Sequence, residues 1–136
     1  MRQELTTPTG RVYLTIDTDR ANRWIAVNWQ GYLTAESIQA GARAYTKTLA
    51  ESGFSCVLND TRDVRGPWEH SMDWVINEWT PAAAAAGLRY FAMIATPDSF
   101  AGDSAAAFYA QLTAFQARVF ADLNTAQEWL RQQVRS

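Results

Sequence analysis

The sequence predicts an α/β domain with a mixed, mostly parallel sheet of four to five strands flanked by helices. Short apolar runs of strand type alternate along the chain with segments of helical periodicity. Two of these runs, residues 54–58 and 88–95, lack the strict alternation of an edge strand, which is typical of strands covered on both faces. Helical segments precede and follow both runs, so the connections must cross over and the sheet must be largely parallel.

The first half of the chain predicts a hairpin followed by a helix. Residues 12–17 and 24–29 alternate apolar and polar side chains on either side of a polar turn, which predicts two antiparallel strands. Thr34 stands at the N-cap position of a helix, and Gly53 stands just after its end. The apolar face of this helix recurs at helical spacing, at Ile38, Ala42, Tyr45 and Leu49.

The next segment predicts a helix that proline interrupts. Pro67 suits the first turn of this helix. Pro81 has no N–H and disfavours helix at the preceding residue, so we expect a kink or a break there. Alanines continue the helix until Gly87. The apolar face consists of Met72, Val75, Ile76 and Trp79.

The last third predicts two more helices, with one alternative left open. A helical stripe runs through Phe108, Leu112, Phe115 and Val119. Its end is ambiguous, because residues 118–120 fit a short edge strand equally well. Asn124, with Gln127 three residues on, predicts the capped start of a final helix. The expected element order is therefore β-β-α-β-α-β-α-(β)-α.

Composition limits the class of protein. The 136 residues fit one domain, which we place at residues 11–136 after a polar lead-in at residues 1–10. A net charge of -2 gives no electrostatic footprint for nucleic acid. We find no signal core and no run of about 20 apolar residues that could span a membrane. We therefore expect a cytoplasmic protein without a transmembrane segment.

Four stretches together resemble the SpoIIAA-like (STAS/SEC14-type) family of small bacterial domains. They are residues 29–34 (WQGYLT), 58–62 (LNDTR), 74–81 (WVINEWTP) with 86–88 (AGL), and 120–130 (FADLNTAQEWL). Their order and spacing carry the resemblance, which covers nearly all of the chain after residue 10. The resemblance implies a mixed sheet flanked by helices and no enzymatic activity.

The resemblance also implies two kinds of partner. STAS-type relatives bind regulatory proteins, and SEC14-type relatives bind lipid-like ligands. Anti-sigma-factor antagonists of the family carry a phosphorylatable serine in the turn after the central strand. That turn reads Asp60-Thr61-Arg62-Asp63 in this chain and has no such serine. A phosphorylation-controlled regulator that uses Thr61 or Ser71 is therefore kept only as an alternative.

The residue pattern offers little for catalysis. His70 and Cys56 are the only histidine and the only cysteine, so no metal-ligand spacing is present, and no cofactor is implied. Cys56 lies within an apolar run, where we expect a buried thiol. His70, Ser71 and Asp73 could be read as a triad, but adjacent helix residues do not face one another. An enzyme with His70 as base remains a second alternative.

The segment at residues 59–66 is the strongest candidate for a binding site. We expect it to be a charged loop at the carboxyl end of a central parallel strand, where open α/β sheets place their ligands. It carries Asp60, Arg62, Asp63 and Arg65. The simpler interpretation is local: the two aspartates pair with the two arginines and cap nearby amides.

Tryptophans extend this candidate site. Trp79 belongs to the apolar face of its helix, whereas Trp68 follows Gly-Pro and Trp74 lies off that face. A partly exposed Trp68–Trp74 pair would form an aromatic surface patch that can bind an apolar ligand, a lipid surface or a partner protein. We therefore predict a non-catalytic module that holds a protein partner or a small apolar, lipid-like ligand, and both peripheral membrane contact and a homodimer stay open. The predicted binding residues are Asp60, Arg62, Arg65, Trp68, His70 and Trp74.

Overall fold

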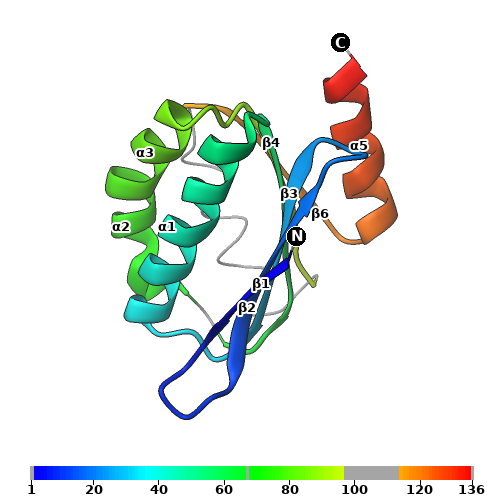
Figure 1. Cartoon of the computed structure of the whole chain (residues 1–136). Coiled ribbons are helices and arrows are strands. Elements are labelled where there is room, and N and C mark those ends of the chain that lie inside the picture. Colours follow the sequence, from blue (N-terminus) through cyan, green and yellow to red (C-terminus); the bar gives the residue numbers. More distant parts are fainter. Residues whose placement is uncertain (1, 67, 97–113, 136) are drawn as a thin grey trace.

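The computed structural model describes residues 2–66, 68–96 and 114–135 (Figure 1). Within these residues, six strands form one sheet in the order β1-β2-β3-β4-β5-β6. The first two pairings are antiparallel and the next three are parallel, which confirms an α/β fold with a mixed sheet. The strands are β1 Arg2–Thr6, β2 Val12–Asp19, β3 Trp24–Gly31, β4 Cys56–Val64, β5 Tyr90–Ile94 and β6 Gln116–Phe120.

The expectation of a polar lead-in is wrong, because Arg2–Thr6 form the edge strand β1. Leu5 pairs with Leu14 of β2 and packs against the core. The Gln3 side-chain amide donates to the Thr48 hydroxyl at 2.9 Å, which ties this edge to the neighbouring helix. Backbone pairing with β2 therefore recruits a segment that has few apolar side chains of its own, and the sheet gains a strand beyond the predicted number.

Helices cover both faces of the sheet (Figure 1). Helix α1, Ala35–Ser52, lies on one face with the helical stretch formed by η1 Glu69–Ser71, α2 Met72–Trp74, η2 Val75–Trp79 and α3 Thr80–Ala85. Helix α5, Leu123–Arg135, covers the other face. The predicted caps of α1 are confirmed: the Thr34 hydroxyl accepts from the Ser37 N–H at 3.0 Å, and Gly53 ends the helix with φ 76°.

Helix α1 packs unusually close to the sheet at Gly41. A Cβ at this position would lie 2.5 Å from the indole of Trp29 and 2.7 Å from the side chain of Leu14. Such distances are well inside van der Waals contact, so only glycine leaves room for the Trp29 ring. The residue is buried and lies in the middle of the helix.

The helix before β5 contains a π-helical turn instead of a break. Residues 75–79 are π-helical, and the N–H and the hydroxyl of Thr80 both bond to the carbonyl oxygen of Val75, the hydroxyl at 2.9 Å. Helical backbone angles persist on both sides of Pro81. The wider turn directly before Pro81 accommodates the missing N–H, so the expected break does not occur.

The described part of the final third decides the alternative that the sequence leaves open at residues 118–120. Residues 116–120 form β6, parallel to β5, so the open alternative resolves as an edge strand. Phe108 and Leu112 lie outside the described residues. Helix α5 follows, but its first turn is capped by Asp122 and not by Asn124. The Asp122 carboxylate accepts from the N–H and the hydroxyl of Thr125, each at 2.8 Å, and these bonds lower its pKa.

Two separate cores result from this arrangement. The larger one lies between the sheet and α1 with the helical stretch at residues 69–85, and it includes Trp29, Tyr45 and Trp79. The smaller core lies under α5 and is built around Trp24, Cys56, Leu58, Ile94 and Leu130. Successive residues of the central strands contribute their side chains to the two cores in turn, as expected for strands that are covered on both faces.

Candidate functional site

The segment at residues 59–66 is a strand for most of its length, which corrects the expected loop. β4 runs to Val64 in parallel pairing with β3, and the Arg65 N–H continues the pairing by donating to the carbonyl of Gly31 at 3.0 Å. Side chains therefore alternate between the two faces of the sheet as far as Asp60 and Thr61, after which a register shift interrupts the pairing with β3. Asn59 and Thr61 face the larger core and are buried, whereas Asp60 lies on the face that carries α5.

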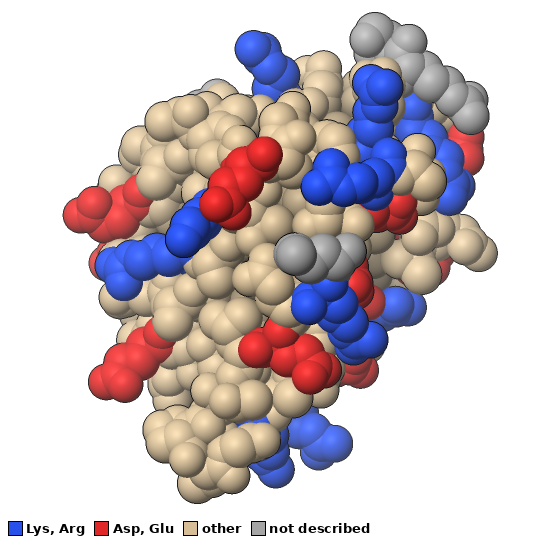
Figure 2. All heavy atoms as spheres, in the orientation of Figure 1, with Lys and Arg blue, Asp and Glu red and all other residues tan. Residues whose placement is uncertain are grey.

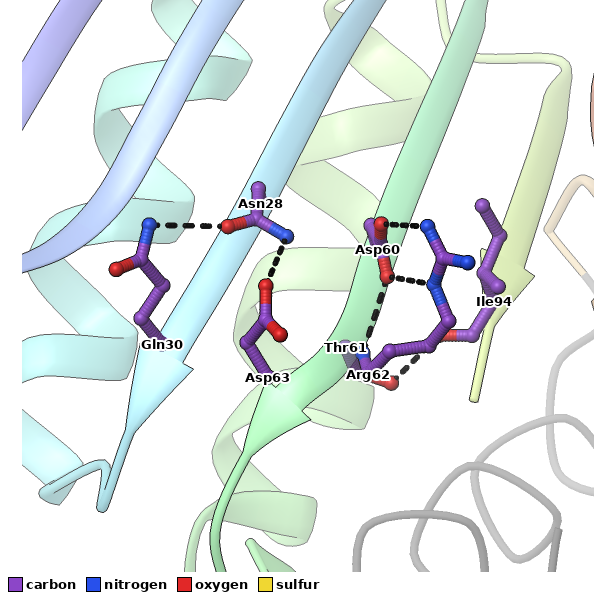
Figure 3. A network of polar contacts seen from close by, with 7 residues as sticks. All are labelled: Asn28, Gln30, Asp60, Thr61, Arg62, Asp63 and Ile94. Atoms are coloured by element: carbon purple, nitrogen blue, oxygen red, sulfur yellow. Dashed lines mark hydrogen bonds and ion pairs between the residues drawn. The ribbon is translucent and has the colours of Figure 1, made fainter. Parts of the chain in front are cut away.

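The two buried polar residues make specific contacts. The Asn59 side-chain oxygen accepts from the indole N–H of Trp29 at 2.8 Å. The Thr61 hydroxyl donates to the carbonyl of Ile94 at 2.7 Å, at the end of β5 (Figure 3). These bonds satisfy groups that would otherwise be costly to bury, and they fix the side chains at the carboxyl ends of three parallel strands.

The opposite face carries a polar network that extends from β3 to β4 (Figure 3). The Arg62 guanidinium donates to both carboxylate oxygens of Asp60, at 3.0 and 2.8 Å, and this pairing raises the pKa of Arg62. Asp60 also accepts from the Arg62 N–H at 3.0 Å. The local interpretation of Asp60 is therefore confirmed. Asp63 differs, because it accepts from the side chain of Asn28 at 3.2 Å and not from an arginine.

An apolar cavity opens between the sheet and the helices on the side of the larger core. Its volume is about 50 Å³, within a hollow of about 470 Å³ that includes its opening to solvent. The sheet contributes Trp29, Asn59, Thr61, Val64, Phe91 and Met93. The helical side contributes Leu33, Ile38, Ala42, Tyr45, Trp68, Val75 and Trp79. Asn59 and Thr61 apart, the wall is aliphatic, aromatic or thioether, as is typical of sites for small apolar molecules.

The predicted exposed pair of tryptophans does not form. Trp68 is 6% exposed and belongs to the cavity wall. Trp74 is half-buried outside the cavity, and the guanidinium of Arg43 lies 5.4 Å from the centre of its ring. The prediction of a partly exposed Trp68 is therefore wrong, because its indole is buried in the cavity wall.

The remaining predicted residues are distributed over the surface and the core. His70, Arg62 and Arg65 are exposed, whereas Thr61 and Ser71 are 5% and 2% exposed. Contrary to the expectation for adjacent residues, the Ser71 hydroxyl lies 3.1 Å from Nδ1 of His70. No carboxylate among the described residues hydrogen-bonds to the His70 ring, so the described residues do not assemble a triad.

Sequence reasoning did not single out several residues of the cavity. Trp29, Asn59 and Tyr45 come from three different elements, and Tyr45 was assigned only to the apolar face of its helix. The position of Asn59 could have indicated its role. Its side-chain amide comes directly after an apolar run, and if the strand continues, this buried amide needs a hydrogen-bond partner. Its partner Trp29 is 30 positions away, so the pairing could not be read locally.

No group of three or more His, Cys, Asp or Glu side chains among the described residues is arranged to hold a metal ion. None of the helices in the same part of the chain is long and apolar enough to cross a membrane.

On the face shown in Figure 2, acidic and basic side chains are interspersed over a largely uncharged surface.

The sole thiol provides a direct test of the packing under α5. Cys56 is 1% exposed, and burial raises the pKa of its thiol. We expect iodoacetamide at neutral pH to leave the folded protein unmodified under conditions that alkylate the denatured chain completely, because the thiolate is the reacting species. Intact mass spectrometry measures the adduct. Alkylation at similar rates in the two states would show that this core opens readily.

Comparison with protein-family models finds no matching family, and comparison with curated proteins finds no match.

Proposed function

We propose that this domain is a non-catalytic module that binds a small apolar ligand in the cavity between the sheet and α1. The observation that carries the proposal is the composition and place of the cavity wall. Trp29, Thr61 and Met93 bring the wall to the carboxyl ends of β3, β4 and β5, where open α/β sheets bind their ligands. The resemblance to SpoIIAA-like domains of the STAS/SEC14 type supports the same class of function.

A protein partner at the exposed edge is the second candidate. Tyr32, directly after β3, is 75% exposed, and Arg62 and Arg65 lie with it around a shallow depression of the surface. Exposed tyrosine and arginine are enriched where proteins bind one another. A pull-down in which Tyr32→Ala with Arg65→Ala releases a partner would support this candidate, and unchanged capture would contradict it.

The two other functions carry less support. Phosphorylation of Thr61 or Ser71 would require a kinase to reach hydroxyls that are buried in the fold. Phosphosite mapping after incubation with lysate and ATP decides this alternative. An enzyme with His70 as base would need a partner that orients the ring, and a His70→Gln variant with unchanged turnover in a broad hydrolase screen would remove it.

The ligand proposal predicts that filling the cavity abolishes binding. Ala42 is 4% exposed and lies in the cavity wall. Ala42→Val adds two carbon atoms there, and we expect it to weaken ligand binding by tenfold or more because the ligand and the new side chain compete for one space. Native mass spectrometry of the protein after exposure to a lipid extract identifies the bound mass, and a titration then compares the variants.

Ala44→Val provides the matched control. Ala44 lies on the same helix and packs partly against the same core, but it does not line the cavity. The change in side-chain volume and helix propensity is the same, so this variant should bind like the wild type. Equal loss of binding in both variants would mean that helix stability and not cavity space controls the result. Absence of any ligand in the wild type would contradict the proposed function.

A further inference from the structure

The hydroxyl group of Tyr45 lies in largely apolar surroundings. The residue is 5% exposed, and its ring packs against Trp29 and Trp79 at centroid distances of 6.4 and 6.0 Å, both of them residues of the cavity wall. No hydrogen bond to this hydroxyl is found within the described part of the chain. Burial raises the pKa of Tyr45 far above its ordinary value, so the group stays a neutral O–H donor at physiological pH.

Asn59 offers a second donor from the opposite wall of the same cavity. Its oxygen accepts from Trp29, which orients the amide and leaves the NH₂ group with two hydrogens to donate. No described residue accepts from that NH₂ group, although Asn59 is only 3% exposed. Each of the two residues therefore offers a donor to an acceptor placed in the cavity.

We propose that the ligand is a neutral apolar molecule with one hydrogen-bond acceptor, such as a ketone or ester carbonyl, held by Asn59 and Tyr45. This inference rests on the proposed function and specifies the chemistry of the ligand. Both groups can donate, and a carbonyl oxygen has two lone pairs with which to accept from them. The Thr61 hydroxyl already donates its hydrogen to a backbone carbonyl, so it has none to donate to the ligand.

The cavity wall discriminates against charge. None of the described residues in the wall is an arginine, a lysine or a histidine, so a carboxylate would have no cation to pair with. Moving an unpaired charge into such surroundings is strongly unfavourable, whereas a carbonyl can be satisfied by neutral donors. A neutral ketone should therefore bind more tightly than a carboxylate of the same chain length.

The size of the cavity limits what it can hold. A cavity of about 150 Å³ admits a benzene molecule, and the volume of this cavity is about 50 Å³. The cavity itself therefore holds only a small group, such as a carbonyl with its methyl group, and an alkyl chain would extend into the wider hollow. A slender methyl ketone matches this shape better than a ring or a branched molecule.

Three probes of equal chain length test the inference: 2-hexanone, hexanoate and n-hexane. Tryptophan fluorescence reports binding, because Trp29, Trp68 and Trp79 lie in the wall. We expect 2-hexanone to bind about tenfold more tightly than either other probe. Tyr45→Phe should weaken 2-hexanone about fivefold, since it removes one neutral hydrogen bond, and it should leave n-hexane unchanged.

Tyr13→Phe is the control, because Tyr13 is buried in the same core but does not line the cavity. It should not change the affinity for any probe. Equal affinity for 2-hexanone and n-hexane, or a preference for hexanoate, would overturn the inference and leave the proposed function standing. An unchanged affinity of Tyr45→Phe for 2-hexanone would also overturn it. Failure of all three probes to bind would overturn the inference and contradict the proposed function.

Discussion

Replacing Trp79 by alanine is expected to lower the free energy of unfolding by about 3–5 kcal/mol, the range measured for buried Trp and Phe. The indole is 3% exposed and packs against Tyr45, Phe91 and Phe115 at centroid distances of 6.0, 5.4 and 5.7 Å. Its N–H also donates to the Thr46 hydroxyl at 3.0 Å. Truncation therefore removes contacts to helix α1, to the sheet and to the segment before β6. Denaturation by urea, followed by circular dichroism, measures the loss.

Trp74→Ala is the matched control for this prediction. Trp74 belongs to the same helical stretch but is half-buried, and its described ring contact is with Arg43 on the surface. We expect at most about half the loss of Trp79→Ala, because burial and cavity formation dominate such effects. Equal losses for the two variants would show that Trp79 is not the centre of the larger core.

Gly41→Ala is expected to destabilise the protein by about 1–3 kcal/mol, the usual cost of overpacking a core. Alanine favours a helix by about 1 kcal/mol over glycine, so helix propensity alone predicts the opposite sign. The new methyl group would overlap the Trp29 ring and the Leu14 side chain at 2.5 and 2.7 Å. Trp29 is also held by its hydrogen bond to Asn59, so the ring has little freedom to move aside.

Ala40→Gly separates packing from helix propensity. Ala40 is exposed on the same helix, one position before Gly41, so its replacement should cost about 1 kcal/mol through propensity alone. Gly41→Ala raises the helix propensity and Ala40→Gly lowers it, yet both should lower the free energy of unfolding. A stabilised Gly41→Ala variant would contradict the close packing of α1 on the sheet. Thermal unfolding of the three proteins side by side provides the comparison.

Local signals account for much of the fold. The two ends of α1 could be predicted from Thr34 and Gly53. A helix cap bonds to backbone groups only a few residues away, so a short stretch of sequence is enough to recognise it. The hairpin of β2 and β3 follows from alternation and a polar turn for the same reason. Strands β4 and β5 could be predicted as central because burial on both faces leaves an apolar run.

The rest of the fold depends on contacts between distant residues. β4 continues through polar residues because β3 pairs with it as far as Val64, with one register shift after Asp60, and because Trp29 satisfies Asn59. β6 has a mostly exposed side-chain pattern, and the spacing of Phe115 and Val119 also fits one helical turn, so the local pattern favours neither form. β1 is recruited mainly through backbone pairing with β2, which side-chain patterns do not report.

The candidate site could be predicted in position but not in composition. The carboxyl end of the central strand is indeed where the cavity lies, yet only Trp68 of the predicted binding residues contributes to its wall. Asp60 and Arg62 bond to each other on the opposite face. The alternation of a strand separates adjacent residues onto two faces, and the assumption of a loop had placed them together.

The sheet order has a consequence for how the chain is synthesised. Because spatial order equals chain order, each strand after the first pairs with one that has already left the ribosome. The larger core can therefore grow stepwise with the nascent chain. The face that carries Trp24, Leu58 and Ile94 is different, because its cover is α5, which follows all six described strands in the chain. A chain that stops before Leu123 would present this apolar face to solvent and should aggregate.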